Sequence, residues 1–131
     1  VSGGSEFLRF PAPAPVALPL GAFGCSIFRD QWPLLDSLQR KWGTASVRIV
    51  VLTMDERRAG ARLERWAESD SSMFEVWRDP DRAIANMVGV EGLPQIVVIG
   101  RDGVVIRRQL GLSKGSIPRW VHAVDSLLRT P

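Results

Sequence analysis

Apolar and polar positions alternate along the chain between strand-like runs and helix-like stripes. Residues 16–23 form an apolar run, although Pro19 weakens it as a strand because proline lacks the backbone N–H that a ladder uses. Residues 26–42 carry apolar side chains at helical spacing, and Pro33 is expected to kink this helix. Residues 47–52 form a nearly continuous β-branched run, which is typical of a buried parallel strand. This part of the chain therefore predicts a strand, a helix and a second strand.

The remainder of the chain continues the alternation and closes with a hairpin and a helix. Asp79 followed by proline is typical of a helix start, with the carboxylate as N-cap and the proline in the first position. Asp102-Gly103 between two apolar runs is a strong hairpin signal. The predicted elements are a helix at 55–69, a strand at 74–77, a helix at 79–88, strands at 95–99 and 104–109, and a helix at 116–128.

This order of elements predicts one α/β domain built on a central mixed β-sheet flanked by helices on both faces. Alternating strands and helices give parallel strands, and the closing hairpin adds an antiparallel edge. The 131 residues suit a single compact domain. Residues 1–7 (VSGGSEF) are typical of a cloning scar, residues 8–15 form a Pro/Ala-rich lead-in, and the domain is expected to span residues 16–131.

Composition and charge narrow the function classes. Apolar residues make up 45% and charged residues 24% of the chain, which is ordinary for a globular protein. The net charge is +3, but basic and acidic residues interleave and form no long basic stripe, so we expect no nucleic-acid partner. A single cysteine and a single histidine exclude metal sites built on several of either, and no cofactor is expected. The histidine, His122, falls in the last predicted helix, where a structural or exposed role is favoured over catalysis.

Cys25 is the main candidate for chemistry. It stands where the first predicted strand passes into the first predicted helix. Unsatisfied backbone N–H groups and the helix dipole at such a position stabilise a thiolate and lower the thiol pKa. A nucleophile available near neutral pH is one interpretation. A buried, inert cysteine is the other, because this residue type is often buried.

A second candidate is Gly92-Leu93-Pro94, which directly precedes the predicted strand at 95–99. Proline fits the first residue of a strand because its missing N–H is not needed there. The sequence allows either a cis or a trans Leu93–Pro94 bond. Taken alone, this segment is also compatible with an ordinary loop proline.

Together these segments resemble the thioredoxin superfamily. Cys25-Ser26-Ile27-Phe28, with Pro33 eight residues after the cysteine, is similar to the active-site helix of that family. Leu93-Pro94 resembles its cis-proline motif, and residues 92–128 are similar to its closing β-β-α unit. The resemblance covers roughly residues 14–129 and implies a thioredoxin-like fold that acts on protein or small-molecule thiols and disulfides.

The extra strand and helix between residues 47 and 90 are similar to the TlpA/ResA branch of the superfamily. Because that branch is exported, the resemblance implies a bacterial periplasmic or extracytoplasmic location, with any signal or membrane tether upstream of this sequence. It also implies which residues form the site. Cys25 would be the attacking residue, and the substrate would contact Gly24, Phe28, Trp32, Leu93 and Pro94.

Trp32 admits two interpretations. Most of the five tryptophans are expected to pack in the core or to be half-buried. Trp32 lies one turn beyond Phe28, so it could instead form an exposed apolar rim with Phe23 and Phe28 beside Cys25. An exposed rim of that kind would indicate a surface that binds a partner.

The sequence departs from the thioredoxin pattern at positions that matter for function. Phe28 stands where the family has the second cysteine, which resolves the mixed disulfide. Gly24 replaces the usual tryptophan, Pro19 falls at about the position of the buried acid, and Gln95 replaces the usual threonine. These departures argue against a dithiol reductase cycle. No Pro-x-x-x-Thr-x-x-Cys pattern precedes Cys25, which argues against a peroxidase.

Three interpretations of function remain. In the first, Cys25 performs monothiol redox chemistry, and an external thiol resolves its mixed disulfide; such a site also senses oxidants as a sulfenic acid. In the second, the domain is a catalytically degenerate binding module that recognises an extended peptide or a partner protein beside Pro94. In the third, Phe28 is a deliberate replacement of a cysteine in an oxidoreductase. The first is favoured because the attacking cysteine is retained at the helix start.

Overall fold

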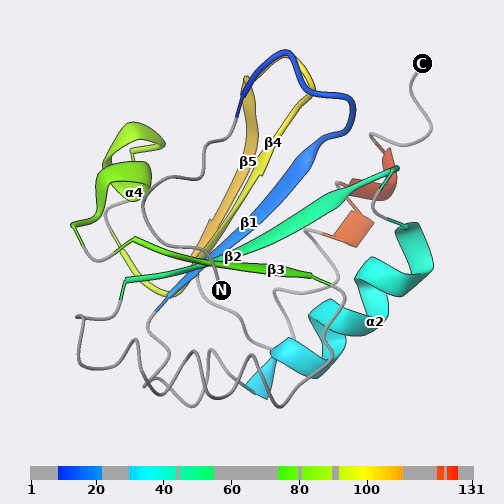
Figure 1. The fold of residues 1–131 in the computed structure, drawn as a ribbon, viewed down its shortest axis with the longest axis horizontal. Coiled ribbons are helices and arrows are strands. Elements are labelled where there is room, and N and C mark those ends of the chain that lie inside the picture. The colour runs from blue at the N-terminus through cyan, green and yellow to red at the C-terminus, as the bar shows by residue number, and fades with distance from the viewer. Residues whose placement is uncertain are drawn as a thin grey trace.

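The structure is a computed structural model that describes residues 9–21, 30–43, 45–54, 74–79, 81–89, 92–110, 121–122 and 124–126. Its centre is a five-stranded sheet with the order β3-β2-β1-β4-β5 (Figure 1). The elements are β1 (Val16–Gly21), α2 (Trp32–Trp42), β2 (Arg48–Thr53), β3 (Glu75–Arg78), α4 (Ala83–Met87), β4 (Gln95–Ile99) and β5 (Val105–Leu110).

The sheet is mixed, as the sequence predicts. β1 and β3 both run parallel to β2. β4 runs antiparallel to β1 on one side and to β5 on the other. The hairpin at Asp102-Gly103 is confirmed: Gly103 has a φ of 85°, and the Asp102 carboxylate accepts the Val104 N–H at 3.1 Å. These features confirm the predicted α/β architecture with an antiparallel edge.

Pro19 lies in the middle of the central strand β1. It stands opposite Ile96 in the ladder with β4, whereas the ladder with β2 has no partner for Leu18 or Pro19. A proline has no N–H to donate, so a central strand tolerates it only where the ladder is interrupted. The strand survives because the rest of β1 is apolar and fully buried.

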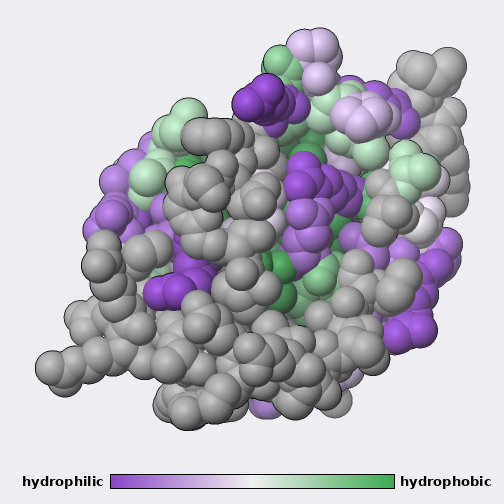
Figure 2. Space-filling view, viewed as in Figure 1, coloured by the Kyte–Doolittle hydropathy of each residue, from purple (hydrophilic) through white to green (hydrophobic). Residues whose placement is uncertain are grey.

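Each face of the sheet buries its own apolar cluster, because side chains alternate between the faces along a strand. One cluster packs against α2 and the helical residues of the C-terminal segment, where Val124 is fully buried. The other packs against α4 through Ala85 and is covered further by Phe10. Figure 1 shows α2 and α4 on opposite sides of the sheet. On the face seen in Figure 2, hydrophilic and hydrophobic side chains intermingle among the coloured residues.

Of the predicted helix at 26–42, the structure describes residues 30–42. Asp30 is helical, Gln31 forms a turn, and α2 runs from Trp32 with Pro33 in its first turn. The interruption is the expected effect of Pro33, which has no N–H for the carbonyl four residues earlier. Gly43 ends α2 with a φ of 76°, a backbone conformation that favours glycine.

The start of α4 differs from the prediction. Asp79 was expected to be the N-cap, with the helix beginning at the next residue, but α4 begins at Ala83 after Arg82, which has a φ of 57°. A turn comes first, in which the Arg82 N–H donates to the Asp79 carbonyl at 2.9 Å. The Asp79 carboxylate nevertheless accepts the N–H groups of Ile84 at 3.2 Å and Ala85 at 3.0 Å. Asp79 therefore satisfies the first turn of α4 from outside the helix.

The predicted helix at 55–69 lies outside the described residues. Of the predicted helix at 116–128, the structure describes residues 121–122 and 124–126, which are helical. Within the described part of the chain, no helix has the length and apolar character needed to span a membrane.

Candidate functional site

The candidate site lies where β1 ends beside the start of β4. Leu20 stands directly opposite Gln95 in the antiparallel ladder between these strands. The loop of Gly92, Leu93 and Pro94 comes immediately before Gln95. It therefore lies at the same end of the sheet as the last residues of β1. The sequence leaves β1 at Gly21 and reaches Cys25 four residues later.

The loop before β4 presents an apolar side chain to solvent. Leu93 is 38% exposed, and Pro94 is half-buried. The Leu93–Pro94 peptide bond is cis. The side-chain amide of Gln95 donates to the Gly92 carbonyl at 3.3 Å, which ties the first residue of β4 back to the start of the loop. The loop thus combines an accessible leucine with a backbone held at both ends.

Cys25, Gly24 and Phe28, which the sequence singled out, lie outside the described residues. The described chain stops at Gly21 and resumes at Asp30. The structure therefore brings together the end of β1, Leu93 and Pro94, while the contacts of the thiol itself stay a prediction.

Trp32 is a core residue in this structure. It is 3% exposed, and its ring meets that of Phe74 edge to face, with centroids 5.7 Å apart at an interplanar angle of 83°. Both residues belong to the apolar cluster beneath α2. Trp32 thus anchors the start of α2 on the sheet rather than forming an exposed rim.

Leu110 is a neighbour of the loop that the sequence analysis did not single out. It stands opposite Gln95 across β4 and β5, and its Cδ1 lies 3.1 Å from the position that a Cβ on Gly92 would take. A side chain larger than hydrogen at residue 92 would therefore press on Leu110. The hairpin register set by Asp102-Gly103 is the sequence signal that could have placed Leu110 here.

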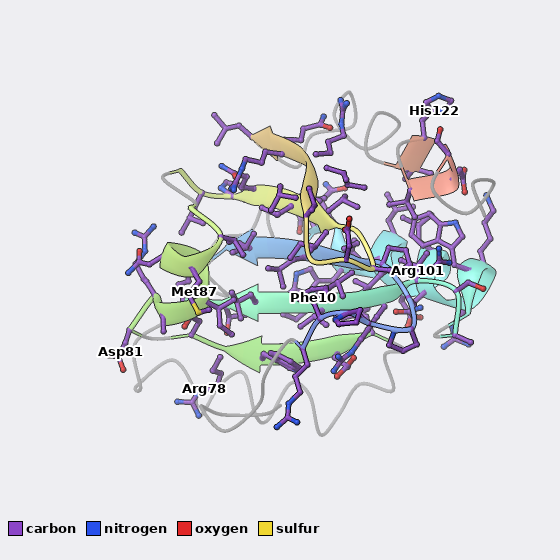
Figure 3. All side chains as sticks on the ribbon, turned by 90° about the horizontal axis from the view of Figure 1, so that it is seen from above. Phe10, Arg78, Asp81, Met87, Arg101 and His122 are labelled. Atoms are coloured by element: carbon purple, nitrogen blue, oxygen red, sulfur yellow. The ribbon has the colours of Figure 1, made fainter. Side chains whose placement is uncertain are left out.

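His122 does not lie at this edge of the sheet. Its side chain is exposed, and in Figure 3 it sits toward the opposite end of the sheet from the arrowheads of β1 and β2. Among the residues that the structure describes, no group of three or more His, Cys, Asp or Glu side chains could hold a metal ion.

Comparison with models of protein families shows which family the chain belongs to. A family model described as the AhpC/TSA family matches residues 15–108. The chain belongs to the AhpC/TSA family. The matched residues include the whole sheet apart from the end of β5, and they include Cys25 and the loop at Leu93 and Pro94. A comparison with curated proteins gives no match.

Solved structures agree on the fold of this AhpC/TSA family member. The chain is similar to a putative thiol:disulfide interchange protein DsbE from Chlorobium tepidum, with 21% identity, a TM-score of 0.78, and 90% of this chain and 82% of that chain covered. A thiol-disulfide isomerase from Corynebacterium glutamicum gives 17% identity and a TM-score of 0.76 over 96% of this chain and 89% of the other. The exposed lipoprotein thioredoxin Etrx1 of Streptococcus pneumoniae gives 19% identity and a TM-score of 0.70 over 88% and 86%.

These similarities confirm the thioredoxin-like, TlpA/ResA-like fold that the sequence predicts. Fold and family together support a function of the thiol–disulfide oxidoreductase kind.

Proposed function

We propose that this protein catalyses thiol–disulfide exchange through Cys25 alone, at the edge of the sheet where β1 ends beside Leu93 and Pro94. The antiparallel pairing of Leu20 with Gln95 carries the proposal, because it sets the strand that leads to Cys25 next to this loop. Cys25 is the fourth residue after Gly21, and a residue spans at most about 3.6 Å, so the two Cα atoms lie within about 14 Å of each other.

Reduction of a substrate disulfide consists of three thiol–disulfide exchanges. The Cys25 thiolate attacks one sulfur of a substrate disulfide; a Cys25–sulfur bond forms, the substrate S–S bond breaks, and the other sulfur leaves as a thiolate that takes up a proton. An external thiol, such as glutathione, is deprotonated and attacks the mixed disulfide, which releases Cys25 as a thiolate and leaves the external sulfur bonded to the substrate. A second external thiol is deprotonated and attacks the external sulfur of that bond, which releases the remaining substrate sulfur as a thiolate that takes up a proton and leaves the two external thiols joined as a disulfide.

The composition of the chain supports a reaction in which Cys25 attacks the substrate and an external thiol resolves the mixed disulfide. Phe28 stands at the position of a resolving cysteine and Cys25 is the sole cysteine, so a thiol from outside the chain must resolve the mixed disulfide. The peroxidase pattern Pro-x-x-x-Thr-x-x-Cys would need proline and threonine where this chain has Leu18 and Ala22. Thiol–disulfide exchange is therefore favoured over peroxide reduction within the AhpC/TSA family.

We assign the substrate contacts to the residues around this edge. Gly24, Phe28, Leu93 and Pro94 would contact the substrate, and the exposure of Leu93 supports its part. Trp32 would contribute indirectly, because its packing in the core holds the start of α2 in place. Extracytoplasmic action is supported by the similarity in fold to Etrx1, an exposed lipoprotein.

Reduction of insulin disulfides by glutathione tests the proposal, with the protein present in catalytic amounts. We expect the wild type to accelerate the reaction and Cys25→Ser to give the uncatalysed rate. Because the chain has one cysteine, a mixed disulfide between the protein and an insulin chain found by mass spectrometry reports on Cys25 directly. Equal rates for the wild type and Cys25→Ser would overturn the proposal.

A second candidate is a binding module that recognises an extended peptide beside Pro94 without redox chemistry. The exposed Leu93 next to the end of β1 is the observation in its favour. The rate of Cys25 alkylation against pH separates the two candidates. A thiol pKa well below the ordinary value of about 8.5 supports exchange chemistry, whereas an inert thiol supports the binding module.

A further inference from the structure

The strand β5 forms an edge of the sheet with an unusual set of exposed side chains. Among the described strands, it pairs with β4 alone, and the strand order ends with it. Ile106 is 43% exposed and Leu110 is 69% exposed, and Arg108 between them is exposed as well. An edge strand with accessible side chains is a template on which another extended segment can pair.

The hydrogen bonds of the sheet show how its strands are oriented about their axes. The Met54 N–H donates to the Gly21 carbonyl at 3.1 Å, so Gly21 turns its backbone polar groups toward β2. Backbone groups alternate in direction along a strand, so Leu20 turns its groups the other way, toward β4. The backbone groups of Leu20 and its partner Gln95 therefore hydrogen-bond with each other between β1 and β4.

The same alternation continues into β5. The backbone polar groups of Gln95 point toward β1. Those of the next residue, Ile96, therefore point toward β5 and hydrogen-bond with its partner there, Gln109. The residues on either side of Gln109, Arg108 and Leu110, then direct their N–H and C=O groups away from the sheet. The open edge thus presents two sets of backbone donors and acceptors, next to a cationic side chain and an apolar one.

The charge on this edge is positive on both faces of the sheet. Arg107 pairs with Val98, which belongs to the cluster under α2, whereas Arg108 pairs with Val97, which belongs to the cluster under α4. The two adjacent arginines therefore extend from opposite faces. A strand added at this edge would have Arg107, whose Nε–H donates to the Gln109 side chain at 3.4 Å, on one face and Arg108, whose guanidinium lies beside Gly89, on the other.

We propose that the outer edge of β5 docks an extended acidic segment of a partner protein, which adds a strand to the sheet. Adjacent side chains of a strand point to opposite faces, so two successive carboxylates in the segment match Arg108 and Arg107 in charge, and an apolar residue two positions from the carboxylate at Arg108 covers Leu110. The segment pairs along residues 107–110, whose register with β4 is regular; the bulge lies beyond, between Val98 and Ile99. A second copy of this chain fits less well, because antiparallel pairing about Arg108 sets two guanidinium groups opposite each other.

Peptide binding measured by fluorescence anisotropy tests the docking site. The probe is a dye-labelled eight-residue peptide that repeats Glu-Glu-Val-Val, which places glutamate and valine in turn on each face, and the matched peptide has lysine in place of glutamate. We expect saturable binding of the acidic peptide and binding at least about tenfold weaker for the basic one, since each reversed cross-strand pair weakens the complex. N-methylation of the alternate amides that face β5 should abolish binding, whereas methylation of the remaining amides should not.

Variants of the protein locate the site. Arg108→Glu should weaken the acidic peptide about tenfold. Lys41→Glu, which makes the same change of charge at an exposed position on α2, should stay within about twofold of the wild type. Cys25→Ser should bind the peptide like the wild type, because docking on β5 does not use the thiol. The outcome of this test is therefore independent of the outcome for the redox proposal.

Three results would overturn the docking site. One is the absence of saturable binding of the acidic peptide, and another is equal affinity for the acidic and basic peptides. The third is a wild-type dimer, detected by sedimentation velocity, that Arg108→Glu dissociates while peptide binding is undetectable; this result would assign the edge to a second copy. Circular dichroism of each variant shows whether the fold is retained.

Discussion

Leu20 and Gln95 stand opposite each other in the antiparallel ladder between β1 and β4, although they lie far apart in the sequence. This pairing fixes the position of the end of β1 relative to the Leu93–Pro94 loop, which directly precedes β4. The nucleophile proposed here follows β1, and the proposed substrate contact precedes β4. A single rung of the sheet thereby brings the end of β1 and the Leu93–Pro94 loop to one end of the sheet.

Leu93→Cys tests this arrangement directly. If Cys25 faces the loop, the two sulfurs should form an intrachain disulfide under mild oxidation, because such a bond needs Cα atoms within about 7 Å. Peptide mapping under non-reducing conditions identifies the bond.

Val104→Cys is the control for Leu93→Cys. It places an accessible thiol, at a residue that is 56% exposed, beyond the hairpin at the other end of β4. It should remain reduced or form intermolecular bonds only. Cross-linking of Cys25 to residue 104 as fast as to residue 93 would contradict the arrangement.

Pro94→Ala should slow the reaction of Cys25 with a peptide disulfide about fivefold. The proline ring restricts the loop, and alanine releases backbone freedom worth about 1 kcal/mol that binding must then remove. Reaction with glutathione disulfide is the comparison, since a small substrate depends less on the loop. Stopped-flow measurement of mixed-disulfide formation gives both rates, and an equal change in the two would show that the loop does not bind the peptide.

Gln39→Leu should lower the free energy of unfolding by about 2–4 kcal/mol, because it removes the partner of two buried backbone groups. The Gln39 amide donates to the Val47 carbonyl at 2.8 Å and accepts the Ile49 N–H at 2.8 Å, and the side chain is 1% exposed. Urea unfolding measures the loss. Ser37→Ala, at an exposed position on the same helix, should change the free energy by less than about 0.5 kcal/mol.

Local chemistry explains which elements the sequence could predict. The bounds of β4 were predicted without error, because β-branched residues between Pro94 and Gly100 leave little choice. The hairpin was found because Asp102-Gly103 accepts the turn geometry by itself. The start of α4 was misplaced because its capping carboxylate acts across an intervening turn, and the Asp79-Pro80 pattern contains no information about that turn.

The candidate site was predictable where motifs are contiguous and not where contacts are long-range. Pro94 was identified from its place before a strand, and its neighbourhood follows from the sheet. The burial of Trp32 could not be decided from the sequence, because its partner Phe74 comes from a distant segment. Leu110 was overlooked for a related reason: an exposed leucine becomes informative only once its rung opposite Gln95 is known.

The capping of α4 by Asp79 leads to a last prediction. Asp79 is 5% exposed and its carboxylate accepts two N–H groups of the first helical turn, so Asp79→Ala should lower the free energy of unfolding by about 1–2 kcal/mol. Hydrogen exchange at Ile84 and Ala85 should accelerate more than exchange in β1, because those amides lose their acceptor. Asp79→Asn keeps one acceptor oxygen and should fall between the wild type and Asp79→Ala. Asp81→Ala, at an exposed neighbouring position, serves as the control, and an equal effect of both alanine variants on these amides would show that the Asp79 carboxylate does not cap the helix.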